Sequence, residues 1–106
     1  MSEILRWPDM SPGDVRPMGI NRWKTHLELD VDETITGESW TSGPVPGDTV
    51  TPGEVTLGDH SYDAIKDRTS VQVTAVSLGD VRCTCRIETS KGQVAYRSAD
   101  VYIVPR

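Results

Sequence analysis

The feature that most constrains this chain is the apolar–polar alternation over residues 69–88, "TSVQVTAVSLGDVRCTCRIE". Successive side chains of a β-strand point to opposite faces, so a period of two predicts two half-buried strands on either side of the turn-forming "SLGD". The residues on the inward parity are Val71, Val73 and Ala75 in the first strand and Val81, Cys83, Cys85 and Ile87 in the second.

The segment that follows predicts a hairpin and a returning strand. "TSKGQ", residues 89–93, offers Gly92 for a backbone with positive φ, and "QVAYRSADVYIV" continues as a strand over residues 93–104. The apolar parity of this strand changes between Val94 with Tyr96 and Val101 with Ile103. Because one extra residue restores such a change, the pattern predicts a β-bulge near residues 97–100.

The central part of the chain predicts further short strands. "LELDVD", residues 27–32, alternates as a half-buried strand does, and a second strand is expected from Ile35 to Trp40. Three prolines and four glycines break residues 42–58 into turns and short edge strands such as "EVTL". "DHSYDAIKDR", residues 59–68, favours a short helix, with Tyr62 and Ile65 three positions apart on one face.

Residues 1–20 predict an extended N-terminal arm. Pro8, Pro12 and Pro17, together with Gly13 and Gly19, prevent a helix of useful length. The arm also carries apolar side chains, namely Ile4, Leu5, Trp7, Met10, Val15, Met18 and Ile20. The sequence leaves open whether the arm lies on its own domain or on a neighbouring subunit. Its deletion is expected to leave a folded domain.

Length and turn spacing point to one all-β domain. A chain of 106 residues is long enough for a single core. Several short strands separated by turns, with almost no helix, predict an antiparallel immunoglobulin-like β-sandwich. We therefore expect an extended N-terminal arm over residues 1–20 and a single β-sandwich domain over residues 21–106.

Charge and hydropathy narrow the classes of partner. The net charge of −5 argues against nucleic-acid binding, and no apolar run is long enough to cross a membrane. The start lacks the layout of a secretory signal, so the protein is expected to be made in a cytoplasm or released from one by lysis. The interval between Lys24 and Lys66 holds no lysine or arginine but nine acidic residues. Folding either intermixes these charges or leaves one acidic and one basic side.

The sequence offers little for catalysis or metal binding. His26 and His60 are the two histidines, and no nucleophile, phosphate-loop or zinc-protease motif is present. The acidic run at residues 30–33 fits a solvated strand end better than a calcium site, and Asp59, His60 and Asp63 make a weak metal candidate. We expect no enzyme activity, no metal and no cofactor.

The two cysteines are expected to be core residues. Cys83 and Cys85 are spaced as C-x-C within a strand, so their side chains point the same way about 7 Å apart. That separation is too long for an undistorted disulfide, and the sequence near them supplies no further zinc ligands.

The order of these segments resembles small tailed-phage virion proteins of the fibre–tail adaptor type. The residues that carry the resemblance are Trp23 and Leu27, then "DETI" and "SW" at Ser39 and Trp40, then "GDVRCTCRIETSKGQ". It covers about residues 20–104, and Val81 and Cys83 depart from the tyrosine and valine of the family pattern. The resemblance implies an immunoglobulin-type β-sandwich and a structural component repeated around a symmetric particle.

The resulting hypothesis is a non-enzymatic phage virion structural protein, made in the bacterial host cytoplasm, that acts as an adaptor at a head–tail or tail–fibre junction. Its partners would be other structural proteins such as portal, tail, fibre or capsid proteins. The alternatives are a capsid decoration (cement) protein and, from another class, a glycan- or receptor-binding module. Trp40 is expected to be core more than anchor. The candidate partner-binding residues are Ile4, Leu5, Trp7, Met10, Val15, Met18, Val45, Val50 and Tyr62.

Overall fold

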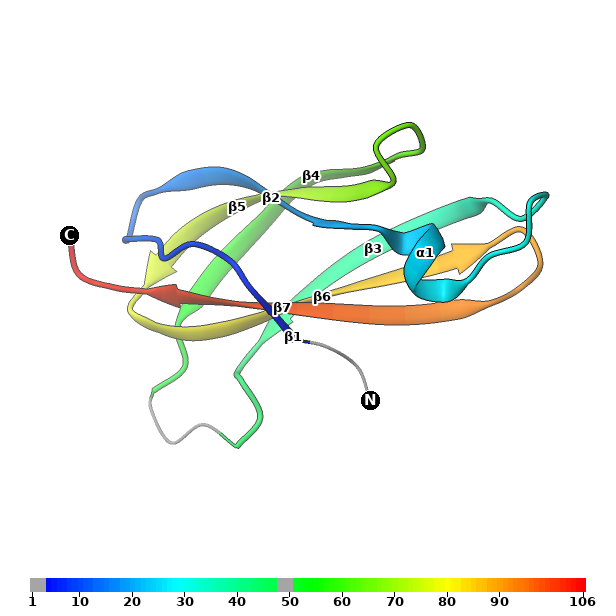
Figure 1. Ribbon diagram of the computed structural model, residues 1–106. Coiled ribbons are helices and arrows are strands. Elements are labelled where there is room, and N and C mark those ends of the chain that lie inside the picture. The colour runs from blue at the N-terminus through cyan, green and yellow to red at the C-terminus, as the bar shows by residue number, and fades with distance from the viewer. Residues whose placement is uncertain (1–3, 48–50) are drawn as a thin grey trace.

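A computed structural model describes residues 4–47 and 51–106 and shows an all-β protein with two sheets (Figure 1). The described residues form seven strands and one helical turn, joined by loops. In chain order they are β1 (Ile4–Arg6), β2 (Val15–Asn21), α1 (Trp23–Leu27), β3 (Ile35–Gly43), β4 (Glu54–Asp63), β5 (Arg68–Ser77), β6 (Gly79–Thr89) and β7 (Val94–Ile103).

The strands form a four-stranded sheet with the order β1-β7-β6-β3 and a three-stranded sheet with the order β2-β5-β4. β1 runs parallel to β7, whereas every other pair is antiparallel. The hydrophobic core lies between the two sheets and receives side chains from both. The arrangement is therefore a β-sandwich, as the number of short strands and the turns between them predict.

The inward parity of β5 and β6 is confirmed. Each predicted core residue of these strands is at most 2% exposed, namely Val71, Val73, Ala75, Val81, Cys83, Cys85 and Ile87. The hairpin after β6 is confirmed as well, with Gly92 at a φ of 84°. Period-two patterns are reliable here because both strands have a neighbour on each side and bury one face completely.

The bulge expected near residues 97–100 is wrong. β6 and β7 pair in one unbroken register from Gly79 with Ile103 to Glu88 with Val94. Val94 and Tyr96 point outward and are 47% and 58% exposed, while Arg97 takes the inward position at 7%. The Arg97 guanidinium lies 5.1 Å from the centre of the Trp23 ring and donates to the Asn21 carbonyl oxygen at 2.6 Å. These contacts make the inward position acceptable for a charged residue.

The strand expected over residues 27–32 is also wrong, because α1 occupies the start of this segment. Trp23 is fully buried, and its indole Nε1 donates to the Ile20 carbonyl oxygen and to Thr69 Oγ1. The turn ends at Glu28, whose φ is 53°, and Val31 is completely exposed beyond it. Burial of the Trp23 indole thus determines the local structure here more than the alternating pattern of the six residues 27–32 does.

The strand expected from Ile35 to Trp40 is confirmed as β3, whereas the helix expected within residues 59–68 is wrong. β4 extends through this segment to Asp63 and reaches β5 through a turn at residues 64–67. The register of β4 with β5 shifts between Leu57 and His60, where two residues oppose Gln72. This bulge gives Leu57 and Tyr62 the same inward side despite their odd separation.

The residues expected to form an extended arm supply strands to both sheets. β1 pairs with β7 and β2 pairs with β5, and the Trp7 backbone N–H donates to the Asp100 carbonyl oxygen at 2.9 Å. Trp7, Met10, Met18 and Ile20 belong to the buried core. From residue 4 onward, the N-terminal segment therefore packs on its own chain.

Candidate interaction surfaces

The outer face of the four-stranded sheet carries a row of paired polar and aromatic side chains. The even-numbered residues of β6 and β7 point away from the core, since the odd-numbered ones fill it. Their register places Arg82 opposite Asp100, Thr84 opposite Ser98 and Arg86 opposite Tyr96. We call this surface the outer face; its residues are Arg6, Arg82, Thr84, Arg86, Glu88, Tyr96, Ser98, Asp100 and Tyr102.

Arg82 and Asp100 form a bidentate ion pair on the outer face. Arg82 Nε donates to Asp100 Oδ1 at 2.8 Å and Nη2 donates to Oδ2 at 3.1 Å. Their side chains are 24% and 12% exposed, so water screens this bidentate pair only in part. Asp100 raises the pKa of Arg82, which keeps the guanidinium charged.

Two neighbouring pairs extend this order along the face. The hydroxyls of Thr84 and Ser98 lie 2.8 Å apart. Arg86 Nη1 donates to Glu88 Oε1 at 2.6 Å, and the adjacent Glu88 and Tyr96 raise the pKa of Arg86. The first contact crosses from β6 to β7, and the second runs along β6. Such contacts fix side chains before any partner arrives, which lowers the entropic cost of binding.

β1 adds a cation–π contact at the edge of the outer face. The Arg6 guanidinium lies 4.2 Å from the centre of the Tyr102 ring, and Arg6 Nη2 donates to Asp9 Oδ1 at 3.0 Å. Ile4 is 42% exposed on the same strand. Arginine and tyrosine are the residue types most enriched at the centres of protein interfaces. The outer face therefore has the composition and the order of a protein-binding surface.

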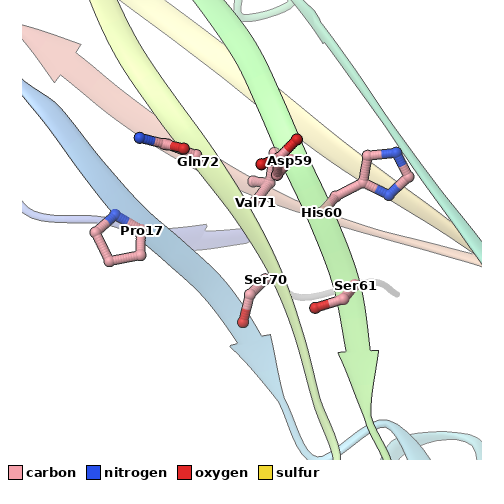
Figure 2. A pocket seen from close by; sticks show the side chains of 7 residues that line it. All are labelled: Pro17, Asp59, His60, Ser61, Ser70, Val71 and Gln72. Atoms are coloured by element: carbon pink, nitrogen blue, oxygen red, sulfur yellow. The ribbon is translucent and has the colours of Figure 1, made fainter.

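The three-stranded sheet carries a shallow cavity on its outer side (Figure 2). Its volume is about 480 Å³, and β2, β4 and β5 supply its lining residues Pro17, Asp59, His60, Ser61, Ser70, Val71 and Gln72. Figure 2 shows the His60 ring turned away from Pro17 and Gln72. This lining holds no tryptophan, tyrosine or phenylalanine on which a sugar ring could stack.

His60 instead contacts Glu38 of the opposite sheet. The β4 bulge directs the His60 side chain toward β3, where Nδ1 and Glu38 Oε1 form a hydrogen bond. The Glu38 side chain is only 9% exposed. This contact joins the edge strands of the two sheets, β3 and β4, on one side of the sandwich.

The eight predicted partner-binding residues that the structure describes fall into three groups by burial. Trp7, Met10 and Met18 are at most 6% exposed and belong to the core. Ile4 and Val15 are exposed at the surface, whereas Leu5, Val45 and Tyr62 are half-buried and Val50 lies outside the described residues. The structure does not gather the described members of this set into one patch, because they are spread over β1, β2, β4 and the connecting segments.

Trp40 is half-buried and packs on Trp7, with ring centres 5.8 Å apart and an interplanar angle of 41°. This contact joins β3 to the segment after β1. As the sequence suggested, the aromatic body of Trp40 is used in packing.

The cysteines are free and completely buried, as predicted. Burial raises the pKa of both the Cys83 and the Cys85 thiol to about 12. Among residues 4–47 and 51–106, no group of three or more His, Cys, Asp or Glu side chains could hold a metal ion. Asp30 and Asp32 of the acidic run are exposed, and each forms an ion pair with Lys91.

Sequence reasoning missed Arg82, Arg86, Tyr96 and Tyr102 as surface candidates. Their common signal is the even parity of two neighbouring strands, which places them on one face once the register is known. For Arg82 and Arg86 the outward parity was available from the sequence. The apolar pattern of β7 predicts an inward Tyr96, and only the register with β6 shows that Tyr96 points outward beside Arg86.

No protein-family model matches this chain, and no curated protein is significantly similar to it. The described part of the chain contains no helix that is long and apolar enough to cross a membrane. What the chain can do must therefore be argued from its surfaces.

Proposed function

We propose that this protein is a non-enzymatic structural component of a tailed-phage virion and acts as an adaptor between other virion proteins. The observation that carries the proposal is the outer face, where Arg82 and Arg6 are held by cross-strand contacts with Asp100 and Tyr102. A sheet face whose long side chains are ordered in advance suits docking to another folded protein better than the turnover of a small substrate.

The strand order supports the immunoglobulin-like form of the sandwich on which the resemblance to fibre–tail adaptors depends. If the strands are lettered A to G in chain order, the sheets are B-E-D and C-F-G, with the first strand added beside the last. This is the strand distribution of a seven-stranded immunoglobulin domain with its A strand moved to the G edge. The fold alone does not select a function, so the proposal relies on the outer face.

The proposal is tested by assembly of particles in a host that produces all other virion proteins. Replacing Arg86 with Glu and Tyr96 with Ala should reduce incorporation of this chain into purified particles at least ~10-fold, because anchor residues dominate interface energy. The control is Gln72→Ala together with Thr74→Ala, which changes the outer side of the other sheet. Equal incorporation of both double variants, with unchanged thermal stability, would refute a docking role of the outer face.

The copy number in particles separates an adaptor from a decoration protein. A ring at a junction holds about a dozen copies or fewer, as the symmetry of such junctions requires, whereas a capsid cement protein is present in hundreds. Quantitative mass spectrometry of purified particles against a known capsid protein measures this ratio. A chain that is missing from particles altogether would remove the virion role.

A further inference from the structure

A cavity lies between β1 and β2, the edge strands of the two sheets on the side away from β3 and β4. Its volume is about 370 Å³, and its lining comes from β1, β2, the residue after each of them and one residue of β7. Three of the seven described residues that line it are Arg6, Arg22 and Arg97, and none of the seven is an aspartate or a glutamate. We call it the arginine cavity. Its lining contrasts with the net charge of −5 of the whole chain.

Asn21, which lines the arginine cavity, holds two arginines through two different oxygen atoms. Its backbone carbonyl oxygen accepts from Arg97 Nη1 at 2.6 Å, and its side-chain Oδ1 accepts from Arg68 Nη1 at 2.9 Å. Arg22 follows directly in the chain, and its backbone N–H donates to the carbonyl oxygen of Asp67, the residue before Arg68. Three arginines, from β5, β7 and the end of β2, therefore gather around one asparagine.

Gly19 leaves the space that Arg68 occupies beside the cavity. It belongs to the cavity lining, and a Cβ built there would lie 2.5 Å from Arg68 Cζ and 2.6 Å from Arg68 Nη2. The half-buried Arg68 side chain therefore lies against the backbone of β2, an approach that a side chain at position 19 would block. Together with the hydrogen bond to Asn21, this contact holds the Arg68 charge in one position.

The backbone at Arg22 does not favour an arginine. Its φ of 62° and ψ of 46° lie in the left-handed region, where glycine and asparagine are common and arginine is not. Local conformational preference therefore does not explain the residue at this position. Strained backbone of this kind is often found at binding sites, where the side chain that it places has a function. The side chain of Arg22 brings a positive charge to the cavity.

We propose that the arginine cavity binds an oxyanion, that is, a carboxylate or a phosphate group, through Arg22 and Arg68. Arg6 is paired with Asp9, whereas neither Arg22 nor Arg68 forms an ion pair with any residue of 4–47 and 51–106. Like charges held close together repel one another, and partial burial weakens the screening by water. An oxyanion removes this repulsion, because a planar guanidinium donates two parallel N–H groups to its oxygens. The inference is independent of the outer face and of the proposed role in a particle.

The first test is an NMR titration of the full chain at constant ionic strength. Two probes are used, inorganic phosphate and a short peptide of glutamate residues, with sodium chloride as the control. The side-chain Nε–H signals of Arg22 and Arg68 should shift to saturation at millimolar probe and stay unchanged in chloride. Saturation by phosphate indicates a free anion as the ligand, and saturation by the peptide alone indicates the carboxylates of a protein partner. If neither probe shifts these signals beyond the chloride control, the inference is wrong.

The second test separates binding from stability at Arg22. Arg22→Asn removes the charge but suits the left-handed backbone, so it should raise the Tm and weaken binding of the probe about tenfold or more. A residue with a merely structural role would lower the Tm when it is replaced. The control is Arg16→Gln, which removes one exposed positive charge of β2 outside the cavity and should leave the affinity unchanged. Undiminished binding by Arg22→Asn, or an equal loss in both variants, would overturn the inference.

Discussion

The Tyr62 hydroxyl donates to Oδ1 of Asp67 at 2.6 Å, and this contact connects β4 to the turn that begins β5. The second carboxylate oxygen, Oδ2, accepts from the Lys24 backbone N–H at 2.9 Å. The Asp67 carbonyl oxygen also accepts from the Arg22 backbone N–H. One aspartate therefore joins the β4–β5 hairpin to the start of α1, which is too short to be stable by itself.

Replacing Asp67 should test how much α1 depends on this contact. Asp67→Ala removes two hydrogen bonds at a residue whose φ is 53°, so we expect a loss of about 2–3 kcal/mol in the free energy of unfolding. Asp67→Asn tolerates the same φ and keeps one acceptor, so its loss should be about half as large. Urea unfolding of the three proteins measures both values. Equal losses for Ala and Asn would show that the side-chain contacts contribute nothing.

The buried thiols should make stability fall at alkaline pH. Burial raises the pKa of Cys83 and Cys85 to about 12, above the value near 8.5 of an unfolded thiol. The folded chain then keeps these protons while the unfolded chain loses them. The contribution is complete below about pH 8.5 and decreases as the pH rises toward 12, by up to about 1.4 kcal/mol per pH unit for each thiol.

The double variant Cys83→Val with Cys85→Val isolates this effect. It should lose at most about 1–2 kcal/mol per site near neutral pH, because valine fills most of the same space. Between pH 8.5 and 10.5 its stability should decline less steeply than that of the unmodified chain, and urea titrations at each pH give the difference. Parallel declines would mean that the thiols ionise as easily in the folded as in the unfolded chain.

The fold was predictable in the central strands, where one face is completely buried and the sequence pattern of the strand itself shows which face that is. β5 and β6 have neighbours on both sides, so Val71 to Ile87 follow the period of two. The sequence-based predictions are wrong where a contact with a residue far away in the sequence determines the local structure. The Trp23 indole donates to Thr69 Oγ1, and the Lys24 backbone N–H donates to Asp67 Oδ2. Both partners are more than forty positions away in the sequence, and these contacts stabilise α1 at the start of the alternating segment. Arg97 can point inward because its guanidinium lies over the ring of the buried Trp23.

The candidate surfaces were less predictable than the fold for the same reason. The row from Arg6 to Tyr102 requires the pairing of β1 with β7, and the contact of Glu38 with His60 requires the edge positions of β3 and β4. Neither the partner of a strand nor its place in the sheet is encoded by its own periodicity. Surface predictions from the sequence therefore favoured conspicuous apolar residues such as Trp7 and Met10, which the fold buries.

Deletion of the N-terminal segment is a direct test of its role. Removing residues 1–20 eliminates β1, nearly all of β2 and four core side chains, including Trp7 and Met10. Each large buried side chain contributes about 2–5 kcal/mol, and their sum exceeds the stability of an ordinary domain. The structure thus leads to the opposite of the sequence-based expectation, and the truncated chain should be unfolded by circular dichroism. Removing residues 1–6 takes away the half-buried Leu5 but none of the fully buried core side chains, so it should leave a folded protein with a lower Tm.

Replacing Gly79, at the junction of β5 and β6, should destabilise the fold. Its φ is 133°, and a Cβ built there would lie 2.3 Å from the Thr51 carbonyl oxygen and 2.4 Å from the Gly53 backbone nitrogen. Both obstacles are backbone atoms that cannot rotate away, so Gly79→Ala must distort the start of β6 or displace the segment before β4. We expect a loss of about 2–4 kcal/mol. Gly43→Ala is the matched control, since no atom of residues 4–47 and 51–106 lies within 4 Å of its Cβ position, and its unfolding midpoint in urea should stay within error of the unmodified chain. If the two variants unfold at the same urea concentration, the close approach of residues 51–53 to β6 does not exist in solution.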